Sequence, residues 1–439
     1  MKKLIFLIVL LMAAPCWSAT YDIGPGETYE TFAAFHAAIT PSPGDIVDGG
    51  GNTFIERVEP NGSGNSTAKV TYRNAVIDGN DTLERGISAS SIDYIIFDDI
   101  EIKDVTDIGI YSNTADSNAT HPRHVEIINC KISGVSAGTH GGIFGYGADV
   151  KIDNCEISKT CVEGIWWNGE RLTVTDCNIT ESSYTAAGNG DCLQLSSDCS
   201  DYYVARNILD HSNNTDKQAF IVGGGSGGIF EYNKCTHLAG NESKCVHIGG
   251  TEGTIRYNEV IGGTYAIWID AIGSKINTNL VHGEIEKRGI HTGVNATIVN
   301  NTVDANGTEG VYISNTPVGT VYNNIITGGW DYGFVDWGSN SIEDYNCSYG
   351  NTDNFAGQAT GAHSIELDPL FTDQANDIFT LKPGSPCINA GVNLGNDYDD
   401  ALNPDSTWPD GVLTIDQDIY KGWEIGAYVW PYGGGYKIW

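Results

Sequence analysis

The chain has 439 residues, with 23 lysines and arginines against 56 aspartates and glutamates, and a formal net charge of −33. A surface this acidic repels nucleic acid and anionic membranes, so neither is expected as a partner. It would also repel an anionic polymer unless cations or a local basic patch intervene.

The N-terminus has the pattern of a secretory signal peptide over residues 1–19. Two lysines follow the initiator methionine, an apolar run extends from Leu4 to Ala14, and small residues follow at Ser18 and Ala19. The apolar run is too short to span a bilayer. We therefore predict export to the periplasm or the medium, without membrane insertion. Ten cysteines follow the leader, and in an oxidising compartment some can form disulfides whose pairing the sequence does not reveal.

An amphipathic helix is predicted at residues 27–39, where the sequence reads ETYETFAAFHAAI. Its apolar residues recur at helical spacing. A helix in this place can cover the open end of a repetitive β-structure, which would otherwise expose strand edges. We assign residues 20–90 to this N-terminal cap and the first coils.

A repeat runs through residues 91–350. Short apolar segments end at an asparagine or aspartate ten times, at intervals of 25, 22, 31, 26, 25, 21, 22, 23 and 22 residues. The ten positions are Asn129, Asn154, Asp176, Asn207, Asn233, Asn258, Asn279, Asn301, Asn324 and Asn346. Repeats of this length are typical of solenoids.

The content of each repeat indicates the type of solenoid. Each contains three short runs of period-two alternation and no pattern of helix length, which favours a parallel β-helix with one strand per sheet in each coil. We expect the repeated asparagine at the tight turn between the second and third strands, since it tolerates left-handed backbone geometry. Stacked at about 4.8 Å, these side chains can form an amide ladder. Cys130, Cys155 and Cys177 should stack inward as a small apolar ladder.

The C-terminal part has a different texture. After about residue 350 the repeat fades, and residues 351–439 are predicted to form a cap packed along the coils. The opening GPGETYETFAAFHAAITPSPGD, the coils, and the tail DPLFTD…FTLKPGSPCINAG…EIGAY resemble secreted bacterial right-handed parallel β-helix proteins of the pectate-lyase-like superfamily. That superfamily includes polysaccharide lyases, glycoside hydrolases, esterases, epimerases and non-enzymatic surface proteins. The resemblance therefore implies the fold more specifically than the activity.

One strand of each coil presents an unusual outward column. Aligning its buried residue gives an apolar side chain in ten coils: Ile110, Ile143, Ile165, Leu193, Phe220, Val246, Ile267, Ile290, Val311 and Phe334. The next residue should point outward, which predicts an outward column of Tyr111, Phe144, Trp166, Gln194, Ile221, His247, Trp268, His291, Tyr312 and Val335. Trp167 should then be buried. Aromatic rings with polar edges suit the faces of sugars, so we expect this column to bind a linear polysaccharide, with Trp166, Gln194, Trp268, His291 and Tyr312 as contacts.

Charged residues occur beside the middle of the column, and they suggest β-elimination from a uronate polymer. This chemistry needs a base for the proton next to the carboxylate and a positive charge to neutralise that carboxylate. Lys244 with His247, and Arg288 with His291 two coils away, are the candidates, joined by Lys217. Glu163, Asp191 and Asp216 could hold Ca²⁺ on neighbouring coils. The β-helix lyases that this chain resembles have similar lysine-plus-calcium or lysine-plus-arginine sites, but no lyase signature matches residue by residue.

Two alternatives stay open. Hydrolysis by two carboxylates would use Asp191 as the acid and Glu163 or Asp216 as its partner. These segments are similar in placement to the acidic motifs of polygalacturonase-type hydrolases, but the paired aspartates are reduced to one and Gln218 stands near the expected histidine. The second alternative is a non-catalytic surface protein that binds glycans. In each case we expect a monomer that acts on, or binds, a polysaccharide.

Overall fold

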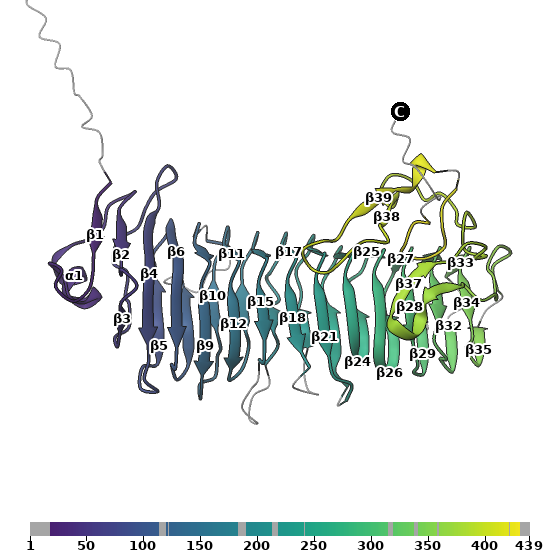
Figure 1. The fold of residues 1–439 in the computed structure, drawn as a ribbon, viewed down its shortest axis with the longest axis horizontal. Coiled ribbons are helices and arrows are strands. Elements are labelled where there is room, and N and C mark those ends of the chain that lie inside the picture. The colour runs from purple at the N-terminus through teal and green to yellow at the C-terminus, as the bar shows by residue number, and fades with distance from the viewer. Residues whose placement is uncertain are drawn as a thin grey trace, which may run out of the picture.

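The computed structural model describes residues 18–113, 120–121, 123–182, 190–212, 218–240, 242–314, 319–337, 341–357, 360–420 and 422–430. The predicted signal peptide lies almost entirely outside these residues. Within them, the chain forms a parallel β-helix of about 13 turns, elongated along the stacking direction (Figure 1). Among the described residues, no helix has the length and apolar character that a membrane span needs.

Each full coil contributes one strand to each of three parallel sheets, named here I, II and III in chain order. Sheet I contains β1 (Thr20–Asp22), β2 (Ile46–Asp48), the start of β4 (Val70–Asp78), the start of β6 (Ile95–Lys103), β8 (Glu126–Ile128), β11 (Lys151–Asp153), β14 (Thr173–Thr175), β17 (Tyr203–Ala205), β20 (Ile229–Glu231), β23 (Thr254–Arg256), β25 (Ser274–Asn277), β27 (Ala296–Val299), β30 (Thr320–Tyr322) and β33 (Ile342–Asp344).

Sheet II follows a tight turn in each coil. It contains β3 (Thr53–Phe54), the ends of β4 and β6, β9 (Lys131–Val135), β12 (Glu156–Thr160), β15 (Asn178–Thr180), β18 (Ile208–His211), β21 (Lys234–His237), the start of β24 (Glu259–Ile269), the start of β26 (Leu280–Thr292), β28 (Thr302–Ala305), β31 (Ile325–Thr327) and β34 (Cys347–Tyr349).

Sheet III carries the outward column. It contains β5 (Arg85–Ser90), β7 (Ile108–Asn113), β10 (Ile143–Tyr146), β13 (Ile165–Asn168), β16 (Leu193–Leu195), β19 (Gln218–Val222), β22 (Lys244–Ile248), the ends of β24 and β26, β29 (Glu309–Ile313), β32 (Tyr332–Asp336) and β35 (Asp353–Ala356). Its register confirms the predicted alignment, because Ile110, Ile143, Ile165 and their successors pair coil by coil through Phe334. All ten are at most 1% exposed, so the interior is a continuous apolar stack.

The repeated asparagines form the predicted ladder, but their place in the coil was predicted correctly for only three of them. Asn129, Asn154 and Asp176 have positive φ and lie at the turn itself. In the seven later coils the positive-φ position belongs to the preceding residue, and the asparagine points into the interior: Asn207, Asn233, Asn258, Asn279, Asn301, Asn324 and Asn346 are each 0% exposed. The first six of these seven amides each donate to the next one along the ladder at 3.0–3.1 Å, and the ladder ends at Asn346.

The cysteine stack occupies the same internal position in the earlier coils. Cys130, Cys155 and Cys177 each follow a positive-φ residue, and the Cys177 backbone N–H donates to the side chain of Asn207 at 2.9 Å, where the amide ladder begins. All ten cysteines are buried and free, so the described residues contain no disulfide. The apolar cysteine ladder is confirmed.

The N-terminal end is covered by a helix shorter than predicted. Helix α1 spans Phe32–Ala38, begins at Thr31, whose hydroxyl accepts from Ala34 N, and buries Phe32 and Phe35. Residues 27–30 are not helical, because the chain there turns back so that Gly24 N donates to Tyr29 O. Figure 1 shows α1 at one end of the solenoid.

A buried histidine makes this cap sensitive to acid. Burial lowers the pKa of His36, which is hydrogen-bonded to Tyr72, to about 4. The unfolded value is about 6.5, so the unfolded chain binds the proton more tightly. The stability that His36 contributes is full above about pH 6.5 and is lost as the pH falls towards 4. We expect the protection of the α1 amides, measured relative to their intrinsic exchange rates, to fall over this range. His36→Gln should flatten that fall, and an unchanged pH slope would contradict the assignment.

The C-terminal segment doubles back along the coils instead of extending the solenoid. It forms two antiparallel hairpins, β36 (Phe371–Asp373) with β37 (Ile378–Leu381) and β38 (Asp400–Leu402) with β39 (Thr414–Asp416), and the 3₁₀ turns η1 (Gln374–Asn376) and η2 (Gln417–Ile419). The Trp408 indole donates to the carbonyl of Tyr257 at 2.7 Å, across 151 residues of sequence. In Figure 1 this segment lies over the later coils.

Candidate active site on sheet III

The outward column divides into two parts of different character. On β7, β10 and β13 the rings of Tyr111, Phe144 and Trp166 stack face to face, at centroid distances of 6.0 and 4.5 Å. The guanidinium of Arg85 covers Tyr111 at 4.1 Å. Trp166 is therefore partly buried rather than open, while Trp167 is 0% exposed as predicted. Because stacked rings cover one another's faces, this part offers mainly ring edges to a sugar.

One polar and one apolar residue follow in the middle coils, and the second part of the column is densely packed. Gln194 and Ile221 separate the aromatic stack from His247, Trp268, His291 and Tyr312, which are paired in register on β22, β24, β26 and β29. The His291 ring lies 3.8 Å from Trp268 and 5.2 Å from Tyr312, both nearly perpendicular. His291 is consequently only 6% exposed.

A second outward row lies two residues before the buried position of each strand. It places Lys244, Tyr265, Arg288 and Glu309 side by side on consecutive coils. Lys244 and Arg288 are thus two coils apart, about 10 Å. Their side chains share this surface with the second part of the column, since the Lys244 ammonium lies 4.9 Å from the centre of the Trp268 ring.

Arg288 is held in a fixed orientation. Its Nε donates to Glu309 Oε2 at 3.1 Å, its Nη1 lies 3.3 Å from His291 Nδ1, and its guanidinium lies 3.8 Å above the ring of Tyr312. Among the described residues the Lys244 ammonium has neither a hydrogen bond nor an ion pair, and it lies over the face of the Trp268 ring. One fixed and one unpaired cation therefore face the same surface.

Two histidines on this surface have opposite proton arrangements. Arginine can only donate, so His291 Nδ1 accepts from Arg288 and a neutral His291 carries its proton on Nε2. Burial, followed by the Arg288 charge, lowers the pKa of His291 to about 3. His247 Nε2 lies 3.1 Å from Asp270 Oδ2. The hydrogen bond with His247 lowers the pKa of Asp270, so its carboxylate is ionised and accepts the proton.

Sequence reasoning left out Tyr265, which lies between the two cations. Its hydroxyl donates to Glu242 Oε2 at 2.6 Å, and Lys287 also binds Glu242. Burial, with the Glu242 hydrogen bond, raises the pKa of Tyr265. The spacing rule that located Lys244 and Arg288, two residues before the buried position, would have located Tyr265 and Glu309 as well.

The carboxylates proposed as calcium ligands are only partly brought together. Glu163 and Asp191 lie two residues before the first residues of β13 and β16, on consecutive coils. Asp191 is 3% exposed, and its Oδ1 accepts from Gln218 N at 2.8 Å, so one oxygen holds the backbone of the next coil. Asp216 and Lys217 lie outside the described residues, and the calcium assignment stays a prediction.

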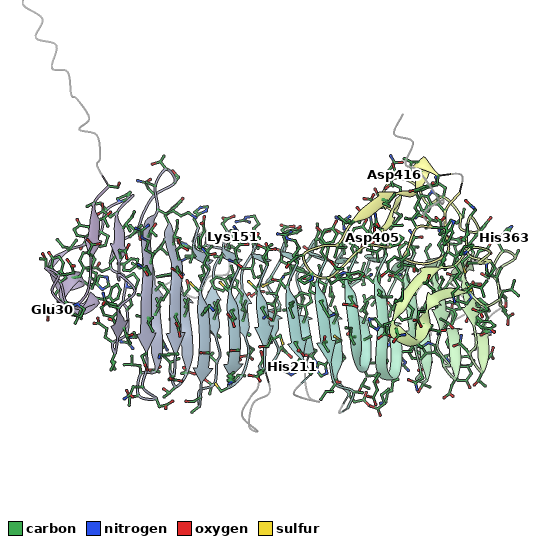
Figure 2. All side chains as sticks on the ribbon, viewed as in Figure 1. Glu30, Lys151, His211, His363, Asp405 and Asp416 are labelled. Atoms are coloured by element: carbon green, nitrogen blue, oxygen red, sulfur yellow. The ribbon has the colours of Figure 1, made fainter. Side chains whose placement is uncertain are left out.

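A different acidic group meets the distance criterion for a metal site. Among the described residues, Asp399, Asp416 and Asp418 are the only three His, Cys, Asp or Glu side chains with ligand atoms within 4.8 Å of one another. They lie on the C-terminal segment, where Figure 2 labels Asp416. This group belongs to a different part of the molecule from sheet III and does not replace the predicted ligands.

Strands β24 and β26 give the middle of this surface a distinct construction. They have 11 and 13 residues and run from sheet II into sheet III without a connecting loop, and their pairing shifts register on either side of Gly263. The coil before them connects these sheets through residues 238–243, and the coil after them through residues 306–308. Tyr265 and Arg288 are therefore carried on continuous strands, which fixes their positions more firmly than a loop would.

No family model matches the sequence, and no curated protein matches it in a sequence search. Solved structures share the fold at low identity. A PL6 family alginate lyase superposes with a TM-score of 0.59 at 13% identity, covering 84% of this chain and 56% of that one. The GH136 lacto-N-biosidase from Eubacterium ramulus gives a TM-score of 0.52 at 12% identity, covering 66% of this chain and 64% of that one. This chain therefore spans less than two thirds of either protein.

A pectate lyase, Pel9A, covers 94% of this chain and 96% of its own at 13% identity, with a TM-score of 0.48. The alginate lyase and the lacto-N-biosidase share the right-handed parallel β-helix fold with this chain. At such identities the likeness concerns the fold.

Proposed function

We propose that the protein is an exported polysaccharide lyase that cleaves a uronate-containing polysaccharide, of the pectate or alginate kind, by β-elimination on sheet III. The observation that carries this proposal is the pair of cations in register, Lys244 and Arg288, on one outward row of a protein with a net charge of −33. The fold also occurs in an alginate lyase, so the scaffold is compatible with such a substrate.

The chemistry assigns a task to each cation. Removing the proton next to a carboxylate builds negative charge on that carboxylate, and a fixed guanidinium stabilises it through paired hydrogen bonds. Arg288 suits this task because Glu309, His291 and Tyr312 fix its orientation. Lys244 would hold the same or a neighbouring carboxylate. The base is then one of the two outward groups on β22, Lys244 or His247.

A calcium ion would supply additional positive charge to the substrate carboxylates. Glu163, Asp191 and Asp216 are the residues proposed to hold it, since carboxylate oxygens are its preferred ligands. Two of them are on adjacent coils, and Asp191 keeps one oxygen on a backbone amide. Because this hydrogen bond occupies one oxygen of Asp191, the residue is less suited to act as the acid in hydrolysis. Hydrolysis is therefore the weaker alternative.

The proposal is tested by ultraviolet absorbance, because β-elimination creates a conjugated unsaturated uronate. The purified protein is incubated with polygalacturonate, alginate and neutral glycans, with Ca²⁺ or with a chelator. We expect absorbance to rise with at least one polyuronate and with no neutral glycan. New reducing ends without absorbance would favour hydrolysis, and binding without either signal would favour a surface protein. Loss of activity in chelator would support the calcium assignment.

A further inference from the structure

The surface around Trp268 contains a histidine–carboxylate pair, His247 with Asp270, and the sequence analysis gave Asp270 no role. His247 on β22 and Asp270, directly after β24, lie on adjacent coils, and their side chains meet at 3.1 Å. The Trp268 indole N–H donates to the same carboxylate oxygen, Asp270 Oδ2, at 2.8 Å. The Asp270 carboxylate therefore accepts hydrogen bonds from two groups, the imidazole of His247 and the indole of Trp268.

This arrangement determines which nitrogen of His247 is available. Because Nε2–H donates to Asp270, the lone pair of the neutral ring is on Nδ1. Nδ1 makes no hydrogen bond among the described residues, and the His247 side chain is 19% exposed. His291, two coils along, has the opposite arrangement, since its Nδ1 lone pair is occupied by Arg288. Of the two, His247 alone has an imidazole lone pair that Arg288 leaves open.

The charged groups around the pair complete the arrangement. Lys244 lies on the same strand as His247, and its ammonium is placed over the Trp268 ring, where the face of the indole attracts a cation. Arg288 and His291 approach from β26, with His291 against Trp268. On the other side, the residue paired with His247 is the neutral Ile221. Lys244 and Arg288 can therefore hold carboxylates while Nδ1 of His247 lies beside them.

We propose that His247 is the catalytic base and that Asp270 is the positioning residue that fixes its tautomer, with Trp268 holding Asp270. This inference rests on the proposed function. His247 Nδ1 takes the proton from the carbon next to the uronate carboxylate. The electrons of that C–H bond form the carbon–carbon double bond, and the glycosidic C–O bond breaks. The leaving oxygen takes a proton from water, and the imidazolium, stabilised by Asp270, returns its proton to solvent.

Kinetics on the polyuronate that the wild-type protein cleaves provide the first test. His247→Ala should lower kcat by about 10²–10⁴-fold, the usual contribution of a general base, and added imidazole should restore part of it. Lys244→Ala should also lose activity, but imidazole should not rescue it. Asp270→Asn should lower kcat by at least about 10-fold with little change in KM, because it removes a stabilising charge from the transition state alone. Asp270→Glu should recover part of the loss.

A matched pair elsewhere supplies the control. His282 Nε2 lies 3.2 Å from Glu259 Oε1 on sheet II, so His282→Gln breaks a comparable histidine–carboxylate contact away from the outward column. It should leave kcat unchanged. If the wild-type protein cleaves the polyuronate and both His247→Ala and Asp270→Asn keep the wild-type kcat, this inference is overturned. The proposed lyase function would then still stand.

Nitrogen NMR of histidine-labelled protein tests the geometry without turnover. The His247 signals should show Nε2–H and a bare Nδ1 at a pH where the ring is neutral, and Asp270→Ala should remove this preference. A proton on Nδ1 in the wild-type protein would overturn the inference. A wild-type protein that cleaves no polyuronate would overturn both the proposed function and the catalytic role of His247, whatever tautomer is found.

Discussion

Replacing Arg288 by alanine should lower kcat for polyuronate cleavage by about 10²–10³-fold, the range seen when a fixed charge-stabilising donor is removed. The guanidinium is fixed by Glu309, His291 and Tyr312, so little reorganisation is needed when charge builds up on the substrate. Lysine is not an adequate replacement, because it lacks the planar pair of donors. We expect Arg288→Lys to recover only part of the activity, measured as initial rates of unsaturated product.

The chain offers a close control for this change. Arg256 on β23 donates to Glu231 at 2.6 Å, and its guanidinium lies 5.3 Å from the Tyr257 ring. It therefore repeats the surroundings of Arg288, but on sheet I. Arg256→Ala should leave kcat within about twofold of the wild type, because Arg256 lies on sheet I, away from the outward column. Equal losses in both variants would mean that structural damage, not lost charge stabilisation, explains the effect.

Replacing Asn279 by alanine should lower the free energy of unfolding by about 3–5 kcal/mol, since each buried polar group left without a partner costs roughly 1–3 kcal/mol. Its Oδ1 accepts from the backbone N–H and the side chain of Asn258, at 3.1 and 3.0 Å. Its Nδ2 donates to the carbonyls of Ile255 and Asn277 and to Asn301 Oδ1, at 3.0–3.1 Å. Urea denaturation followed by tryptophan fluorescence measures the change.

Asn129 is the matched comparison for the ladder. It belongs to the same repeat, but it is exposed, has a φ of 56°, and lies at the turn itself. Glycine adopts this geometry without strain, so Asn129→Gly should cost at most about 1 kcal/mol. Similar losses in Asn129→Gly and Asn279→Ala would show that the buried ladder has no special energetic weight.

The sequence was sufficient to predict the register of sheet III, for a physical reason. The aligned inward position of this sheet is apolar in each of the ten coils and every coil must return to the same place, so the ten positions from Ile110 to Phe334 leave few alternatives. For seven of the asparagines the predicted turn position was wrong by one residue, because asparagine is accepted both at the turn and in the interior. At the turn it adopts left-handed geometry, and inside it bonds to its neighbours. Composition alone does not separate these two roles.

The sequence predicted part of the arrangement of the site but none of its contacts. The alternation of strands predicts that His247 and His291, each one residue after a buried position, lie on the outward face, whereas Lys244 and Arg288 were placed only by their position just before the aligned strands. The sequence could not show that Trp268 holds Asp270, because that contact depends on how two side chains of one coil turn towards each other. Nor could it show which nitrogen of each histidine is occupied.

Cleavage in heavy-oxygen water tests the central claim most directly. Elimination breaks the glycosidic bond without adding water, whereas hydrolysis adds one oxygen from solvent to each product pair. The wild-type protein is incubated in heavy-oxygen water with the oligouronate that it cleaves fastest. The masses of the products are measured by mass spectrometry at early times. We expect product pairs whose masses sum to that of the substrate, one bearing the unsaturated end and neither carrying heavy oxygen. Products that carry one heavy oxygen would contradict β-elimination on this surface.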